Sequence, residues 1–248
     1  MSAGSASDEG SRVLVTVCTF RERENLETLI PAIRHALPGA DVLIIDDNSP
    51  DGTAAFVQDW SQRDSQVHLL LRQTKEGLGA ATIAGFEWGL TREYDFLINM
   101  DADFSHPPQI LPQLLAQMPH ADVAIGSRYI TGGRIEGWPW FRHVMSRGVN
   151  FYARNWLGLT CRDCSGAFRC YRTGLLRQLD FTRFRAKGYA FQEEILYHLH
   201  RKGARFTEVP ITFRDRVVGT SKINGSEARK ALKDIFLLGC DRLFGTRR

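Results

Sequence analysis

Short apolar segments alternate with segments of helical periodicity along the first half of this 248-residue chain. The apolar segments occupy residues 13–17, 42–45, 67–71, 96–100 and 123–125, and helices are expected near residues 26–33, 54–60, 79–90 and 108–118. Strands that are apolar at consecutive positions are typical of a sheet buried on both faces. Strands that alternate with helices favour a mostly parallel sheet. We therefore predict an α/β fold in which helices cover both faces of this sheet.

The length of the chain predicts one large domain with short appendages. Residues 1–11 are small and polar, lack the apolar core of a signal peptide, and are expected to form a disordered tail. The main domain is expected over residues 12–225, and an amphipathic helix over residues 226–248. That helix could pack on the main domain or lie at a membrane interface. Because the sequence has no apolar run near eighteen residues, we expect no membrane span.

Charge, cysteine content and the absence of two common motifs limit the kinds of ligand and metal site that this chain could have. The formal net charge is +4, and the basic residues are concentrated in residues 128–248, which suits phosphate, a nucleotide or an acidic membrane surface. Five cysteines are consistent with reduced thiols in a cytosolic setting. Cys161 and Cys164 have zinc-knuckle spacing, but no second pair accompanies them and a structural zinc ion needs four ligands. Neither a GxGxxG nor a Walker A motif is present, which disfavours dinucleotide and P-loop classes.

Asp101 and Asp103 follow the apolar segment that ends at residue 100. An extended backbone directs side chains two residues apart to the same side, so these carboxylates are expected to converge. Their repulsion would be relieved by a cation such as Mg²⁺ or Mn²⁺, which proteins often hold with carboxylates and substrate phosphates. An Asp-rich solvated turn is the alternative, and the motif alone leaves both interpretations open.

Polar clusters also follow the other expected strands, at residues 18–22, 46–53 and 75–80. Each cluster could be ordinary turn chemistry. In parallel α/β sheets, however, ligands bind beyond the carboxyl ends of the strands, so four such clusters are better explained by one nucleotide site. Gly77 and Gly79 would let the backbone approach a ligand closely.

Several longer motifs resemble those of family 2 glycosyltransferases with the GT-A fold, and specifically the dolichyl-phosphate (polyprenyl-phosphate) mannosyltransferase family. They occupy residues 44–53, 101–103, 126–129, 165–169, 188–192, 208–211 and 215–222. The similarity runs from about residue 13 to the C-terminus, and the motifs of the second half are the more specific ones.

The resemblance implies roles for individual residues. Nucleotide-sugar binding is implied for Cys18, Phe20, Glu22, Ile45, Asp47, Asp101, Ala102, Arg128, Arg216 and Lys222. Metal binding is implied for Asp101, Asp103 and Ser105, and contact with the acceptor phosphate for Arg128, Arg142 and Ser146. Asp101, Asp103, Arg128 and Arg216 are the expected catalytic residues.

The implied activity is inverting transfer of mannose from GDP-mannose to dolichyl or another polyprenyl phosphate, which gives a β-linked lipid-phosphate mannose. The cofactor would be Mg²⁺ or Mn²⁺. The alternative is a related family 2 transferase that uses UDP-glucose or another acceptor. We expect a peripheral protein on the cytoplasmic face of a membrane, docked directly or through a membrane-anchoring partner, and no nucleic-acid partner.

Overall fold

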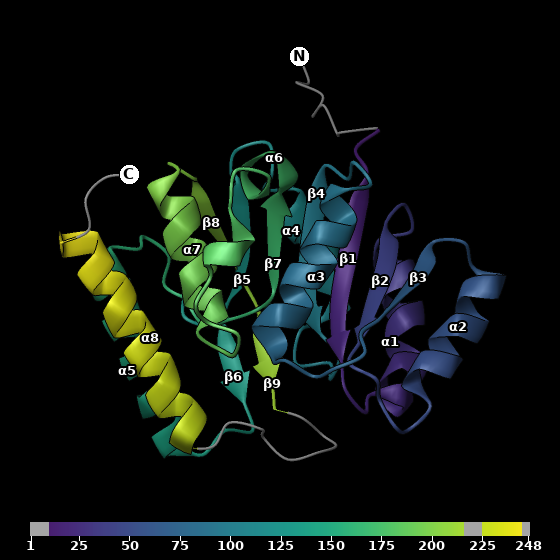
Figure 1. Cartoon of the computed structure of the whole chain (residues 1–248), viewed down its shortest axis with the longest axis horizontal. Coiled ribbons are helices and arrows are strands. Elements are labelled where there is room, and N and C mark those ends of the chain that lie inside the picture. Colours follow the sequence, from purple (N-terminus) through teal and green to yellow (C-terminus); the bar gives the residue numbers. More distant parts are fainter. Residues whose placement is uncertain (1–9, 216–224, 245–248) are drawn as a thin grey trace.

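The central sheet of the computed structural model contains seven strands, and the structure describes residues 10–215 and 225–244. In spatial order the strands are β3 (Val67–Leu71), β2 (Asp41–Asp46), β1 (Val13–Thr19), β4 (Phe96–Asp101), β7 (Arg169–Arg172), β5 (Val123–Ser127) and β8 (Phe206–Pro210) (Figure 1). All neighbouring strands are parallel except β7, which runs antiparallel between β4 and β5. The predicted α/β fold with a mostly parallel sheet is therefore confirmed.

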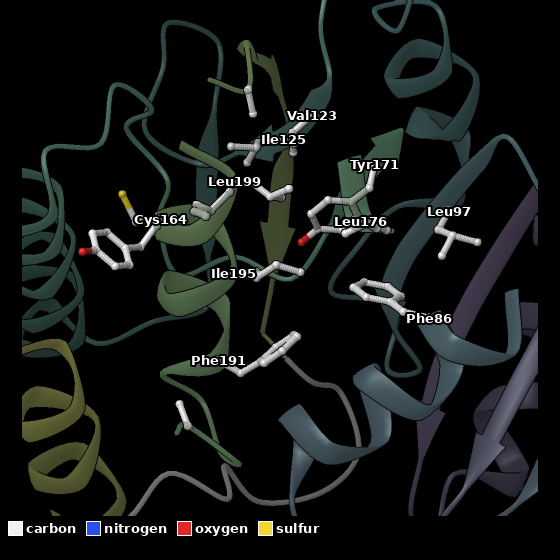
Figure 2. Close-up of a cluster of buried hydrophobic side chains, with 14 of the residues drawn as sticks. Phe86, Leu97, Val123, Ile125, Cys164, Tyr171, Leu176, Phe191, Ile195 and Leu199 are labelled. Carbon is white, nitrogen blue, oxygen red and sulfur yellow. The ribbon is translucent and has the colours of Figure 1, made fainter. Parts of the chain in front are cut away.

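Helices cover both faces of the sheet because successive strand residues point to opposite sides and are apolar on both. Val13, Val15 and Val17 of β1 belong to one buried cluster, whereas Leu14 belongs to the other. The first cluster lies under α1 (Arg23–Ala36), α2 (Thr53–Arg63) and α4 (Leu111–Leu115), and the second under α3 (Leu78–Leu90), α6 (Thr173–Leu176) and α7 (Phe191–Arg201). Figure 2 shows Phe86 of α3 and Phe191 of α7 within this second cluster.

The helix expected over residues 108–118 is shorter and irregular. It consists of the 3-10 turn η1 (Pro108–Ile110) followed by α4, which ends at Leu115. Proline at position 112 has no N–H to donate to the carbonyl of Pro108, and its ring would clash there in a continuous α-helix. The N–H of Leu111 bonds to that carbonyl instead, with 3-10 spacing. The other expected strands and helices lie within a few residues of their predicted positions.

Two long helices lie side by side at the β8 end of the sheet (Figure 1). They are α5 (Trp140–Leu157) and α8 (Gly225–Phe244). The rings of Trp156 and Phe236 stack at 5.7 Å, and Trp156 Nε1 donates to the Phe236 carbonyl at 3.0 Å. Gly239 is needed at this contact, since a Cβ there would lie 1.7 Å from Trp156 Nε1. Over the residues that the structure describes, no helix is both long enough and apolar enough to cross a bilayer.

The remaining elements are small. β6 (Arg134–Glu136) and β9 (Thr212–Arg214) pair in parallel and form a separate two-stranded sheet. The 3-10 turn η2 (Phe181–Arg183) precedes α7. The β6–β9 sheet is important for the site because β6 leads into α5, and β9 ends next to Asp215.

Candidate functional site

The carboxyl ends of three parallel strands bring the predicted nucleotide-binding residues into one row. Cys18 of β1 is in register with Ile45 of β2 on one side and with Asp101 of β4 on the other. Arg128 follows the end of β5, which is also parallel to these strands. The edge of the sheet therefore brings together residues that are 110 positions apart in the sequence.

The first part of the row carries a buried acid, Asp47, and a partly buried thiol, Cys18. Asp47 accepts a hydrogen bond from Arg72 at 2.5 Å, between the loops that follow β2 and β3. Burial raises the pKa of Asp47 above its ordinary value, although the charge of Arg72 opposes the shift. Burial also raises the pKa of Cys18 to about 12, which keeps the thiol protonated and disfavours a role as a nucleophile.

The loop after β1 presents an aromatic ring and a carboxylate. Lys75 Nζ lies 3.6 Å from the ring centroid of Phe20, a cation–π distance. Glu22 precedes α1 and accepts a hydrogen bond from Asn25 at 2.7 Å. Because Lys75 comes from the loop after β3, this contact joins two of the four polar clusters that the sequence places at the sheet edge.

The loop after β4 holds the candidate metal ligands. Asp101 and Asp103 are partly exposed, while Ala102 between them is buried. Ser105 donates its backbone N–H to Asp103 Oδ1 at 3.1 Å, and its own buried hydroxyl has no partner. A buried hydroxyl without a partner is costly, and coordination of a cation would satisfy it. The oxygen atoms of these three side chains therefore fit the coordination chemistry of a divalent ion.

His106 is a site residue that sequence reasoning missed. Its Nδ1 accepts the backbone N–H of Asp101 at 3.0 Å, and its ring stacks on Phe168 at 5.1 Å. Burial lowers the pKa of His106, which favours the neutral ring that this acceptor role requires. Its position three residues after Asp103 was the available signal, but the sequence does not show which way the ring points.

Strained backbone also gathers at this edge. Arg21, Asn48 and Phe104 have positive φ values of 61°, 54° and 59°, and each lies in a loop after β1, β2 or β4. Positive φ is unfavourable for residues with a side chain, and such residues cluster at ligand-binding sites. The described chain has one further example, Glu93, which lies after α3.

Arg128 is held by a carboxylate that was not predicted as a site residue. Asp163 is fully buried and accepts hydrogen bonds from Arg128 Nε and Nη2, each at 2.7 Å. It also accepts the backbone N–H groups of Arg128 and Gly166, each at 3.0 Å. Burial alone would raise the pKa of Asp163, but the charge and hydrogen bonds of Arg128 outweigh it, so the pKa lies below its ordinary value.

Two of the three predicted acceptor residues, Arg142 and Ser146, lie four residues apart on α5, and both have partners within the chain. Arg142 Nη1 donates to Asp215 at 2.8 Å, and its guanidinium lies 4.2 Å from the ring centroid of Trp138. The Ser146 hydroxyl is 2.6 Å from that of Tyr129, the residue after Arg128. The structure thus brings Ser146 to the Arg128 segment through Tyr129, a contact that the sequence did not indicate.

Two predicted glycines have a packing role, and two predicted basic residues lie outside the described part of the chain. Gly77 and Gly79 allow close packing within the chain, because Cβ atoms there would lie 2.4 Å and 2.8 Å from the carbonyl oxygens of Lys187 and Ala186. Close approach of a ligand to this backbone stays a prediction. Arg216 and Lys222, which the resemblance places near the phosphates, fall in residues 216–224 and lie outside the described part of the chain.

A second buried acid lies near the Arg128–Asp163 pair. Glu193, in the first turn of α7, is 3% exposed, and its Oε2 has no hydrogen-bond partner. Burial raises the pKa of Glu193 to about 7, while the nearby charge of Arg169 acts in the opposite direction. Arg169 is itself buried and donates to the carbonyls of Gln192 and Cys164.

Comparison with known proteins identifies the family. Residues 14–180 match the model of glycosyl transferase family 2. The chain is 44% identical to the polyprenol monophosphomannose synthase of Mycolicibacterium smegmatis, over 89% of this chain and 84% of the relative. It is 43% identical to the undecaprenyl-phosphate mannosyltransferase of Micrococcus luteus, over 90% of this chain and 92% of the relative. Identity to the dolichol-phosphate mannosyltransferase of Pyrococcus furiosus is 34%, over 92% of this chain but 63% of that protein.

Solved structures agree on the fold. Glucosyl-3-phosphoglycerate synthase from Mycobacterium tuberculosis, solved with Mn²⁺, UDP and phosphoglyceric acid, superposes with a TM-score of 0.71. The alignment covers 93% of this chain and 79% of that structure, at 16% identity. At that identity the match establishes the GT-A fold alone, which the resemblance had implied. Together with the family match over residues 14–180, it shows that the chain belongs to glycosyl transferase family 2.

Proposed function

We propose that this protein is an inverting mannosyltransferase that moves mannose from GDP-mannose to dolichyl phosphate or another polyprenyl phosphate. The names and the 43–44% identity of the two bacterial relatives support the mannosyl group and the acceptor class. The observation that carries the proposal is the row of Cys18, Ile45 and Asp101 at the sheet edge, with Arg128 beyond the end of β5. We assign the activity to residues 12–225.

The chemistry needs little help from a general base. The second pKa of a phosphate monoester is about 6, so the acceptor is already a dianion near neutral pH. Its oxygen attacks the anomeric carbon of mannose from the side opposite to GDP, one carbon–oxygen bond forms while another breaks, and the configuration inverts. Two phosphate-bearing molecules repel each other, so Arg128 would offset their charge, and we assign Arg216 and Lys222 to the same task.

We propose Mg²⁺ or Mn²⁺ as the cofactor, held by Asp101, Asp103 and Ser105 together with the donor diphosphate. The partner-free hydroxyl of Ser105 and the carboxylates on either side of Ala102 fit this oxygen-rich coordination. The ion would stabilise the negative charge that develops on the departing GDP.

The first test concerns the donor. GDP should bind more tightly than UDP in isothermal titration calorimetry with Mn²⁺ present, and labelled mannose should pass from GDP-mannose to polyprenyl phosphate. Glucose from UDP-glucose serves as the matched comparison in the same assay. Equal affinities, or transfer from UDP-glucose alone, would overturn the donor assignment and favour the alternative family 2 activity.

A membrane surface is the proposed location, through the exposed side of α5 and α8. These helices leave large apolar side chains exposed, with Trp140 77% and Phe244 83% accessible. The others on the same two helices are Phe141, Val144, Met145, Phe151, Leu232, Phe236, Leu237 and Leu243. Exposed apolar side chains gathered on neighbouring helices mark an interaction site, and nearby basic residues such as Lys233 and Arg242 suit anionic lipids. We propose that this α5–α8 surface docks on the cytoplasmic face of the bilayer.

The second test measures this docking. The protein should co-sediment with phosphatidylcholine vesicles that contain phosphatidylglycerol. The double variant Trp140→Glu, Phe244→Glu should bind at least about tenfold more weakly, because each buried apolar side chain contributes roughly 1.5–3 kcal/mol. Leu71→Glu, on the edge strand at the other end of the sheet, is the control and should bind normally. If wild-type protein binds neither neutral nor anionic vesicles, the result would instead favour a membrane-anchoring protein partner.

A further inference from the structure

One indole ring lies against both arginines of the acceptor side. The guanidinium carbon of Arg142 is 4.2 Å from the ring centroid of Trp138, and that of Arg128 is 5.7 Å from it. Both distances are within the range of cation–π attraction, which is strongest for tryptophan. The two arginines come from different parts of the chain, since Arg128 follows β5 and Arg142 is in α5. Trp138 lies between them in the sequence, just before α5.

Each guanidinium is also held by a carboxylate of its own. Asp163 accepts from Nε and Nη2 of Arg128, and Asp215 accepts from Nη1 of Arg142. Nη1 of Arg128 makes no hydrogen bond to the described residues, and neither do Nε and Nη2 of Arg142. Among the described residues, nothing occupies these donors, and the carboxylates fix the two side chains.

The ring itself is fixed from a third direction. Phe213 of β9 meets Trp138 edge to face at 5.4 Å, and His106 meets Phe213 at 6.0 Å. Since His106 accepts the N–H of Asp101, a continuous aromatic contact joins the loop of the candidate metal ligands to the start of α5. Trp138 Nε1 is buried and has no hydrogen-bond partner, so the indole N–H is one more donor without an acceptor. Such groups are costly unless a ligand satisfies them.

We propose that Trp138 is a positioning residue which holds the guanidiniums of Arg128 and Arg142 together, so that they bind the phosphate of the lipid acceptor as a pair. This inference rests on the proposed function. Two like charges on one ring repel each other, and a dianionic phosphate between them removes the repulsion. The site should therefore favour a phosphate monoester, which carries close to two charges near neutral pH, over a phosphodiester, which carries one.

Three variants test this role with a short-chain, water-soluble polyprenyl phosphate, which avoids effects of membrane docking. Trp138→Leu removes the ring and should raise the acceptor KM roughly tenfold to a hundredfold, with donor affinity measured by GDP calorimetry unchanged. Trp138→Phe keeps a ring and should restore most of the acceptor affinity. Trp88→Leu is the matched control, because Trp88 has the same kind of contact with Arg92, at 3.8 Å, away from the site. It should leave the acceptor KM unchanged.

A double-mutant cycle separates positioning from general stability. If Trp138 acts through Arg142, then Trp138→Leu should add less than about threefold to the acceptor KM when Arg142 is already alanine. An unchanged acceptor KM in Trp138→Leu, or full additivity with Arg142→Ala, would overturn the inference. Should Trp138→Leu fail to fold, Trp138→Met provides the same comparison with more side-chain volume. Failure of wild-type protein to mannosylate the polyprenyl phosphate would refute the proposed function, which is a separate outcome.

Discussion

Replacing Asp103 with alanine should abolish mannosyl transfer while leaving the fold intact. Asp103 is partly exposed and lies in the loop after β4, where it accepts a local hydrogen bond from the backbone N–H of Ser105. Its loss should therefore cost little stability. A preorganised charge that stabilises the leaving group is typically worth a factor of 10²–10³ in turnover, and a metal ligand shared with the diphosphate supplies such a charge. We expect a decrease of at least about that size.

The measurement is the initial rate with labelled GDP-mannose and polyprenyl phosphate, both saturating, beside thermal unfolding and calorimetric binding of Mn²⁺ in the presence of GDP. Asp64→Ala is a suitable control, because Asp64 is another partly exposed aspartate and forms an ion pair with Arg34 at the end of α2, away from the sheet edge that carries Asp101 and Asp103. It should lose some stability and no activity. Near-normal turnover of Asp103→Ala with Mg²⁺ or Mn²⁺ present would show that the metal site has been placed wrongly.

Much of the fold could be predicted from the apolar pattern of the chain. Successive strand residues point to opposite faces of the sheet, so a sheet that is covered on both faces needs strands with consecutive apolar residues. The same pattern could not place β7, which enters antiparallel between β4 and β5. Its four residues include the buried Arg169, so no continuous apolar segment marks it. The β6–β9 sheet was missed for a similar reason, since each strand has three residues and none of them is fully buried.

The candidate site likewise contains residues that the sequence could predict and residues that it could not. Residues that directly follow apolar strands, such as Cys18, Asp47 and Asp101, could be proposed because parallel strands end at one edge. Asp163 and Trp138 could not, because their importance comes from contacts with Arg128 across 35 and 10 residues, in segments without a regular repeat. In the sequence, Asp163 lies between Cys161 and Cys164, and the spacing of these two cysteines suggested only a zinc knuckle for this segment.

Asp163 should prove as important as the residues that touch the substrates. Its carboxylate accepts two hydrogen bonds from the Arg128 side chain and two from backbone N–H groups, all inside the protein. Asp163→Asn turns one acceptor into a donor that faces other donors, and it removes the charge opposite a buried guanidinium. Breaking a buried ion pair in this way typically costs 3–5 kcal/mol, so we expect a loss of about that size in the free energy of unfolding. Transfer should fall at least about a hundredfold, because Arg128 is no longer held.

Adding Arg128→Met to Asp163→Asn separates the two effects. The double variant has no unpaired buried charge, so it should recover part of the lost stability in urea unfolding, since the removal of both partners costs less than the removal of one. It should recover no transfer activity, because the guanidinium that the acceptor and donor phosphates need is absent. Stability that returns without activity would show that the pair is kept for its position at the phosphates rather than for folding. Wild-type turnover in Asp163→Asn would contradict the positioning role of Asp163, because Arg128 would then act at the phosphates without a carboxylate partner.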